Sequence, residues 1–457
     1  MRTGPGSHAL VIGASVTGLC AARVLRSHFD RVTIVERDRL EDGPAFRSGV
    51  PHSRHLHLLL GKGRQLLEVL FPELPAAFEC SKVPLINLTR DLEMFTFVGM
   101  VPRYRSVHET RACSRLWLES TLRAMLRVQP GIELVDQAEV AALLESPRGV
   151  VSAVELRRRS GPRELVSADL VVDATGRNSK ALDWLAALNY PTPSIETVNA
   201  HLGYASRWYE KPRRASEPWL GVYTGLEPIR NSRIGVLFPV EGERWVLTLA
   251  GMGQEQPPTD EQGFLQFTRR LARPTIYETL PALRPISPIY GYRATENRWI
   301  HFERMDRWPD GFVAMGDAVC CFNPVYGQGI SVAALEAVLL SRLLEDRGST
   351  LRGFARRFQR KLPSVLETAW VMSTGEDLRW PATEGGTRSV AKRLTHWYLD
   401  QFVRDMCESR EMIETFIAVQ HLMVPPTALL HPSIVARLTA RAVRTRLDRE
   451  LGTVEPI

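Results

Sequence analysis

The chain has 457 residues, of which 44% are hydrophobic and 24% charged, which is typical of a globular protein with about two or three domains. The net charge of +7 is modest and scattered, so nucleic-acid binding is not indicated, and no run of about 18 apolar residues predicts a transmembrane helix. Six cysteines without a Cys-x-x-Cys pair argue against structural zinc, and with no secretory profile at the N-terminus they favour a cytoplasmic protein.

The first predicted unit is a strand–helix–strand element of about 30 residues. Two apolar runs, "HALVIGAS" and "RVTIVERD", flank the helical pattern "VTGLCAARVLRSH". The turn before the helix nearly matches a dinucleotide-binding Gly-x-Gly-x-x-Gly sequence, with Gly13, Ser15 and Gly18 at its three positions. The Ser15 hydroxyl could donate to a phosphate, and Glu36 after the second strand could accept both ribose hydroxyls, which favours an adenosine diphosphate without a 2′-phosphate. On this segment alone, a plain turn without a ligand is the alternative.

The middle of the chain changes character twice. We expect a helix over residues 114–128, capped by Ser114, and strands over 131–145 and 149–159. Residues 196–252 are β-rich, with a hairpin at "VEGE", and a helix follows at about 260–273. The fold predicted is α/β, with a Rossmann-like nucleotide-binding domain, a β-sheet substrate domain and a helical C-terminal extension. The boundaries predicted are 1–80, 105–190 and 285–345 for the first, 81–104 and 191–284 for the second, and 346–457 for the third.

A second glycine-rich element lies far along the chain, in "GDAVCCFNPVYGQGISVAALEAVLL". Asp317 ends a strand, and a loop with Pro324, Gly327 and Gly329 leads into a helix whose first N–H groups would bind an anion. Asp317 would accept from the hydroxyls of a polyol, and the glycines would let the backbone lie flat against a ring. One long cofactor would connect the two elements, and FAD fits this description whereas NAD has no polyol.

Three stretches carry a family resemblance: "VIGASVTGLCAARVL…VTIVERD", "DLVVDATGR" and "GFVAMGDAVCCFNPVYGQGISVAALEA". With them the chain resembles the FAD-dependent monooxygenases of the aromatic-hydroxylase type (group A) over most of residues 8–345. It is most similar to bacterial secondary-metabolism members, including polyether epoxidases, which share forms of "RSGVPHSRHLHLLL" and "ACSRLWLE". Members of that branch often carry serine at the middle position of the first motif, which favours a working loop.

The resemblance implies roles for individual residues. The ADP half would contact Gly13, Ser15, Gly18, Glu36, Arg37 and, through its backbone, Val140. Arg47 would reach the cofactor phosphates or approach the flavin, and Arg115 would contact the ribityl-phosphate region. Asp317 would bind the ribityl chain, and Pro324, Gly327 and Gly329 would border the isoalloxazine ring. Asp173 and Gly176 of "DATGR" are closer to the epoxidase and halogenase form than to the hydroxylase form. Electrons would therefore come from NAD(P)H either directly or through a flavin reductase.

The reaction that the resemblance implies is insertion of one oxygen atom from O2, through a flavin C4a-hydroperoxide, into an alkene or ring of a lipophilic secondary metabolite. The chemistry would take place on the flavin, so no catalytic side chain or metal is nominated. Candidates for the substrate pocket are Tyr204, Arg207, Phe238, Trp245 and Thr248, whereas His55 and His57 are expected to be packed histidines.

Other functions remain open. One alternative is an FAD-dependent reductase or dehydrogenase of prenyl or polyene chains, which shares "DATGR". A halogenase is disfavoured because the sequence has no Trp-x-Trp-x-Ile-Pro segment, and a non-enzymatic flavin-binding partner protein is a further alternative. The protein would be a monomer or a homodimer, and the C-terminal helices could close the substrate cavity, form a dimer face or simply pack.

Overall fold

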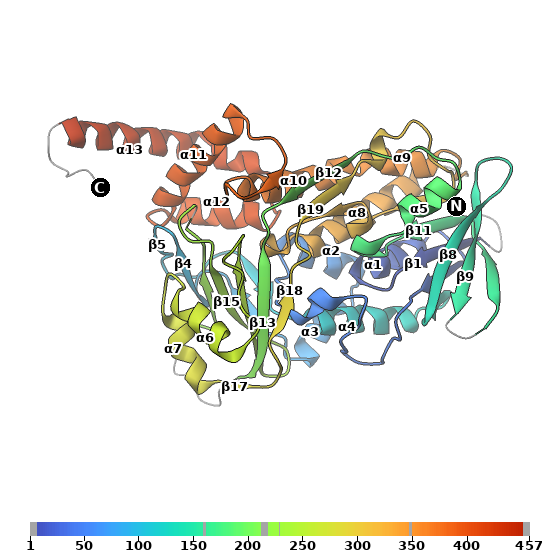
Figure 1. Ribbon diagram of the computed structural model, residues 1–457, viewed down its shortest axis with the longest axis horizontal. Helices are drawn as coiled ribbons and strands as arrows, with labels where there is room; N and C mark the ends of the chain where they lie inside the picture. Colours follow the sequence, from blue (N-terminus) through green and yellow to red (C-terminus); the bar gives the residue numbers. More distant parts are fainter. Residues whose placement is uncertain (1–6, 159–160, 212–217, 228, 347–349, 451–457) are drawn as a thin grey trace.

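A five-stranded parallel sheet forms the centre of the nucleotide-binding part (Figure 1). The computed structural model describes residues 7–158, 161–211, 218–227, 229–346 and 350–450, so the outermost ends of the predicted domains lie outside it. In spatial order, the strands are β20 (Phe312–Ala314), β11 (Leu170–Asp173), β1 (His8–Ile12), β2 (Arg31–Val35) and β7 (Ile132–Val135). All five residues of β1 are buried, as expected for the middle strand of a parallel sheet that is covered on both faces.

Helices and a small antiparallel sheet cover the central sheet. The helices of this part are α1 (Val16–Leu25), α2 (Gly61–Leu70), α3 (Leu74–Cys80), α4 (Arg115–Arg127), α5 (Ala181–Ala187) and α8 (Gly329–Glu345). Helix α1 packs against α8 and α4 as well as against β1 and β2. The small sheet contains β8 (Ala138–Glu145), β9 (Val151–Arg158) and β10 (Arg163–Ser167), and β9 contacts β11. This arrangement confirms the predicted α/β fold and its Rossmann-like domain.

An eight-stranded sheet forms the second part of the molecule. It contains β4 (Leu92–Thr96), β5 (Gly99–Met100), β13 (Gly203–Glu210), β14 (Gly221–Thr224), β15 (Ile234–Val240), β16 (Arg244–Gly251), β17 (Arg284–Pro285) and β18 (Tyr290–Tyr292). The hairpin predicted at "VEGE" joins β15 to β16. The helix predicted at about 260–273 is the shorter α6 (Glu261–Arg269), and a further helix, α7 (Thr275–Thr279), follows Pro274. Because β18 pairs with β13, the chain returns to the nucleotide-binding part later than residue 285.

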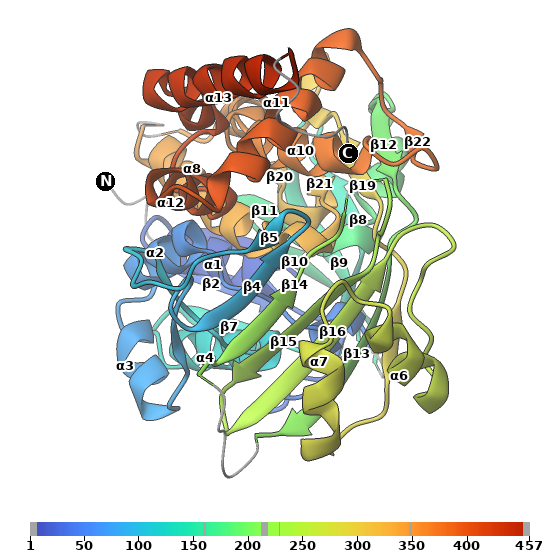
Figure 2. The same ribbon diagram turned by 90° about the vertical axis from the view of Figure 1, so that its left-hand side faces the viewer.

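The C-terminal region is helical; its last three helices lie at one end of the eight-stranded sheet, beside β4 and β5 (Figure 2), whereas its first two pack against α8 of the nucleotide-binding part. Its helices are α9 (Phe354–Lys361), α10 (Pro363–Asp377), α11 (Val390–Met406), α12 (Arg410–Gln420) and α13 (Pro432–Glu450). A hydrophobic cluster joins Phe402 and Ile413 of these helices to Leu92 and Phe238 of the sheet. Helices α11, α12 and α13 therefore share a core with the predicted substrate domain, whereas α9 and α10 contribute to the core of the nucleotide-binding part.

Two smaller sheets complete the fold. A four-stranded sheet of β12 (Ile195–Asn199), β19 (Asn297–Ile300), β21 (Cys320–Cys321) and β22 (Glu384–Gly385) connects the two parts of the chain, and β3 (Leu85–Asn87) pairs with β6 (Glu109–Arg111). Cys320 and Cys321 are buried with free thiols. Within the described ranges, no helix is both long and apolar enough to cross a membrane.

Candidate functional site

A pocket of about 620 Å³, including its open mouth, lies where β1, β2 and β11 end. It brings together five residues predicted to contact the ADP half of a cofactor, namely Gly13, Ser15, Glu36, Arg37 and Val140, and also Arg47, which is predicted to reach the phosphates or approach the flavin. Carboxyl ends of strands in such sheets are where ligands bind. The pocket therefore collects, from four separate stretches of sequence, half of the twelve cofactor-binding residues that the first motif and the resemblance predict.

The two glycines of the first motif are required by close backbone contacts. Gly13 has a φ of +106°, and a Cβ atom there would lie 2.5 Å from the carbonyl oxygen of Ala174. At Gly18 a Cβ atom would lie 1.9 Å from the carbonyl oxygen of Gly13. No side chain caps helix α1, so the N–H groups of its first turn are available to an anion.

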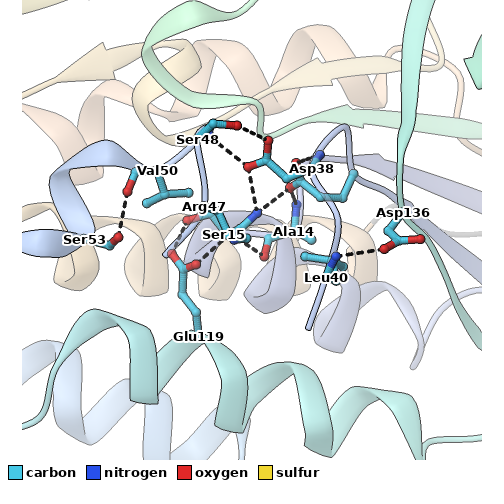
Figure 3. A network of polar contacts seen from close by, with 12 residues as sticks. Ala14, Ser15, Asp38, Leu40, Arg47, Ser48, Val50, Ser53, Glu119 and Asp136 are labelled. Atoms are coloured by element: carbon cyan, nitrogen blue, oxygen red, sulfur yellow. Dashed lines mark hydrogen bonds and ion pairs between the residues drawn. The ribbon is translucent and has the colours of Figure 1, made fainter. Parts of the chain in front are cut away.

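Arg47 occupies the centre of a buried ionic network beside this turn (Figure 3). Its guanidinium lies 3.1 Å from a carboxylate oxygen of Glu36, 3.7 Å from Asp38 and 2.7 Å from Glu119. Burial opposes its charge, but Glu119 and Glu36 raise the pKa of Arg47 above its ordinary value. Glu36 also accepts a hydrogen bond from the Ala14 amide at 2.9 Å, so this carboxylate both lines the pocket and holds the turn.

Ser15 and Glu119 extend the network to helix α4. The Ser15 hydroxyl donates to Glu119 at 2.5 Å and accepts from Arg115 at 2.7 Å. Arg115 also donates to Glu119 at 2.8 Å, one helical turn further along α4. Burial alone would raise the pKa of Glu119, but Arg115 and Arg47 lower it to about 2. In the structure the Ser15 hydroxyl therefore donates its hydrogen bond to the Glu119 carboxylate, and donation to a phosphate stays a prediction.

Asp317 lies close to the first motif although it is far away in sequence. A Cβ atom on Gly176, whose φ is +80°, would be 4.0 Å from that of Asp317, and the preceding Gly316 packs against Thr17 of α1. Asp173 is fully buried and accepts from the hydroxyls of Thr175 and Ser179, at 2.6 and 2.5 Å. In "DATGR", Asp173 therefore holds the turn together, while Gly176 provides the surface near Asp317.

The second glycine-rich loop leads from Asp317 into a helix, as the sequence predicts. Pro324–Tyr326 form a single 3-10 turn, Gly327 has a φ of +67°, and α8 begins at Gly329 without a side-chain cap. A Cβ atom on Gly327 would lie 3.7 Å from Leu60, so the loop faces the end of the "RHLHLLL" segment. The loop and this segment form two sides of the region where a flavin ring is expected.

The eight-stranded sheet turns only some of its predicted pocket residues toward this region. Tyr204, Phe238 and Thr248 share one face, because Thr248 pairs with Ser206, and Tyr204 lies two positions before Ser206. On that face the Thr248 hydroxyl accepts from the Leu56 amide at 3.1 Å, and Ser206 bonds to Nδ1 of His55 at 2.8 Å. His55 is therefore a packed histidine, as predicted.

The prediction is wrong for Arg207 and Trp245, which lie on the opposite face. Arg207 donates to Glu261 of α6 at 2.6 Å, and Trp245 packs against Trp219 at a ring separation of 5.8 Å. Alternation along a strand separates two sets of residues, but it does not say which set faces the ligand.

Sequence reasoning missed several polar and aromatic residues of the pocket and its network. Thr175, Lys180 and Trp184 line the pocket, and Glu119 links Arg47 to Ser15. The spacing of Arg115 and Glu119 on a predicted helix could have indicated an ion pair, but not its contact with Ser15. In the part of the chain that the structure describes, no group of three or more His, Cys, Asp or Glu residues could hold a metal ion.

These features fit an extended dinucleotide. The backbone at Gly13 forms a cradle that a Cβ atom would fill, and it leads into the uncapped start of α1. A second uncapped helix start, that of α8, follows Asp317 in the chain. The start of α1 suits a diphosphate and the start of α8 suits the electron-rich edge of a flavin, because helix N-termini stabilise negative charge. FAD is a cofactor with groups of both kinds and a polyol between them.

Comparisons with known proteins agree with this geometry. The model of an FAD-binding-domain family matches residues 7–356. Protein Rv3254 of Mycobacterium tuberculosis (strain ATCC 25618 / H37Rv) is 30% identical over 480 aligned positions, which cover 99% of this chain and 97% of that protein.

Solved structures share the fold at lower identity. The flavin-dependent brominase Bmp2 superposes with a TM-score of 0.65 at 13% identity, covering 97% of this chain and 100% of its own. PqsL of Pseudomonas aeruginosa, described as a probable FAD-dependent monooxygenase, gives a TM-score of 0.56 at 17% identity, covering 82% and 98%. The myxobacterial chondrochloren halogenase CndH gives 0.61 at 15% identity, covering 91% and 96%.

Proposed function

Because the chain belongs to this FAD-binding-domain family, we propose that it is an FAD-dependent monooxygenase that inserts one oxygen atom of O2 into a lipophilic secondary metabolite. Epoxidation of an alkene and hydroxylation of a ring are the two forms of this reaction. The observation that carries the proposal is the pocket that Gly13, Ser15 and Thr175 line, because Gly176, which follows Thr175, lies close to Asp317 at the start of the second glycine-rich loop.

The residues of the chain would bind and orient the cofactor. Gly13 and the first turn of α1 would contact the diphosphate, and Glu36 would accept from the ribose hydroxyls. Asp317 would accept from the ribityl chain, and Pro324–Gly327 would support the ring. Bound FAD supplies the activation of O2, and the protein excludes water and positions the substrate.

The substrate would approach the ring from the face of the eight-stranded sheet that carries Tyr204, Phe238 and Thr248. Tyr204 is 8% exposed, and its hydroxyl has no hydrogen-bond partner among the described residues. Phe238 belongs to the cluster shared with the C-terminal helices. This face is largely apolar, which suits a lipophilic guest.

The first experiment is purification followed by an absorption spectrum and titration of the apoprotein with FAD. A yellow protein, or FAD binding at micromolar concentration, is expected. NADH and NADPH are then added separately under anaerobic conditions, and bleaching by either one identifies a direct electron donor. If neither bleaches the flavin, a flavin reductase is supplied.

Oxygen uptake with candidate lipophilic substrates then separates the monooxygenase from a reductase or dehydrogenase of prenyl chains. We expect uptake that depends on the substrate and a product heavier by one oxygen atom. A product with added hydrogen, or a halogenated product formed only with bromide or chloride, would replace this proposal. A pure, folded protein that stays colourless and binds no FAD would overturn it.

A further inference from the structure

A buried carboxylate of the C-terminal region touches the loop proposed to support the flavin. Asp377 ends helix α10, has no exposed surface, and lies beyond residues 7–356, which match the family. Three neutral side chains donate hydrogen bonds to it. They are Asn297 at 2.7 Å, Asn323 at 3.0 Å to each carboxylate oxygen, and Tyr326 at 2.8 Å.

Two of these donors belong to the loop itself. Asn323 and Tyr326 flank Pro324 and Val325, and the side-chain oxygen of Asn323 accepts from the Val325 amide at 3.2 Å. One carboxylate therefore holds both ends of the 3-10 turn. The conformation of the loop depends on a side chain that is more than 50 residues away in the sequence.

A second contact from the same helix supports this arrangement. Ser373, four residues before Asp377 on α10, donates to the side-chain oxygen of Asn297 at 2.6 Å. The same oxygen accepts from the Asn323 amide at 2.7 Å. Helix α10 thus binds the beginning of the loop through Asn297 as well as directly.

The burial of Asp377 disfavours its charged form, so a carboxylate at this position has an energetic cost. Burial raises its pKa to about 6, although the bonds from Asn323, Tyr326 and Asn297 oppose the shift. All hydrogen-bond partners of its carboxylate among the described residues are uncharged. A buried carboxylate is costly unless its hydrogen bonds are satisfied, and here they are satisfied by the loop.

We propose that Asp377 is a positioning residue of the cofactor site, which fixes the Asn323–Gly327 loop so that the flavin ring can lie against it. The C-terminal helices are then part of the cofactor site rather than only a cover for the substrate sheet. The proposal rests on the proposed function in one respect, that the ligand of the loop is FAD.

The first test measures the FAD dissociation constant of four variants at pH 7.5. Asp377→Asn places an amide among donors, and Tyr326→Phe removes one of them, so each should weaken FAD binding about tenfold or more. The double variant Asn323→Asp with Asp377→Asn exchanges the two groups. It restores a donor opposite an acceptor and should recover most of the affinity.

The fourth variant is the control, Asp400→Asn. Asp400 of α11 pairs with Arg379 just after α10, so this variant weakens the packing of the C-terminal helices without touching the loop. It should lower the melting temperature and leave the FAD dissociation constant within about twofold. Unchanged affinity in both Asp377→Asn and Tyr326→Phe would overturn the proposal, as would an equal loss in Asp400→Asn.

Hydrogen exchange of the apoprotein tests the positioning role without any cofactor. Amides of residues 322–328 should exchange faster in Asp377→Asn than in the wild type, and the double variant Asn323→Asp with Asp377→Asn should restore their protection. If the loop amides are unaffected, the proposal fails even if FAD binds. If the wild type binds no FAD but the loop responds as expected, the proposed function fails and the role of Asp377 in the loop stands.

Discussion

Replacement of Glu336 by glutamine should make the stability of the protein less dependent on pH. Glu336 lies on α8 with no exposed surface, and one of its carboxylate oxygens accepts from the Gly316 amide at 2.5 Å. The other oxygen has no hydrogen-bond partner among the described residues. Burial raises the pKa of Glu336 to about 8, and Asp317 adds to this while the Gly316 bond opposes it.

The magnitude follows from the difference between this pKa and the value of 4.5 for an unperturbed glutamate. The folded protein holds the proton more tightly than the unfolded chain, so the stabilisation is complete below pH 4.5 and is lost as the pH rises through about 8. At about 1.36 kcal/mol for each pKa unit, the wild type should lose about 3–4 kcal/mol between pH 5 and pH 8 through this group alone. Glu336→Gln is neutral throughout and should not lose it.

Urea unfolding of both proteins at pH 5, 6, 7 and 8 measures the effect. The stability of Glu336→Gln relative to the wild type should rise steadily by about 3–4 kcal/mol over this range. Glu345→Gln, at the exposed end of the same helix, is the matched control and should show no such trend. A difference between Glu336→Gln and wild type that stays constant within about 0.5 kcal/mol would refute the reasoning.

Three further predictions concern the pocket. Glu119→Gln should cost about 3 kcal/mol at pH 7, because the pKa of Glu119 is lowered from 4.5 to about 2, and urea unfolding should show this loss shrinking as the pH falls from 4.5 toward 2. Gly13→Ala should lower the melting temperature and abolish FAD binding, because its Cβ would lie 2.5 Å from Ala174 at a φ of +106°, whereas Gly43→Ala, with nothing within 4 Å, should do neither. Asp317→Asn should weaken FAD binding about tenfold in a fluorescence titration and leave the melting temperature of the apoprotein unchanged; a normal affinity would remove Asp317 from the site.

The parts of the site that are readable from sequence are those set by local backbone geometry. Gly13 and Gly18 are needed where a strand turns sharply into a helix, and Glu36 follows from the end of the next strand. Ser114 as a helix cap was equally readable, since its hydroxyl accepts from the Trp117 amide. These features depend on neighbours a few residues away, so their spacing in the sequence carries the information.

Features that depend on the packing of distant elements were not readable. Alternation along the strand puts Tyr204 and Arg207 on opposite faces of β13, but only the tertiary structure shows that α6 covers the face that carries Arg207. The same applies to Asp377, which is one acidic residue at the end of a helical pattern until the fold brings it to Asn323. Motifs located the cofactor site, and tertiary structure decides which other side chains complete it.

The charges around the pocket indicate what would hold the phosphates of a bound dinucleotide. Arg47 and Arg115 already share Glu119, and Lys180 contacts Glu139, so these cations are paired before any phosphate arrives. A diphosphate would have to compete with these carboxylates for each of them, and a buried pair that loses one partner leaves an uncompensated charge. The uncapped first turn of α1 adds positive potential that no carboxylate side chain caps. The backbone geometry that Gly13 permits should therefore matter more for phosphate binding than Arg47, Arg115 or Lys180, and the serine of the first motif serves the network of Glu119 without closing that turn.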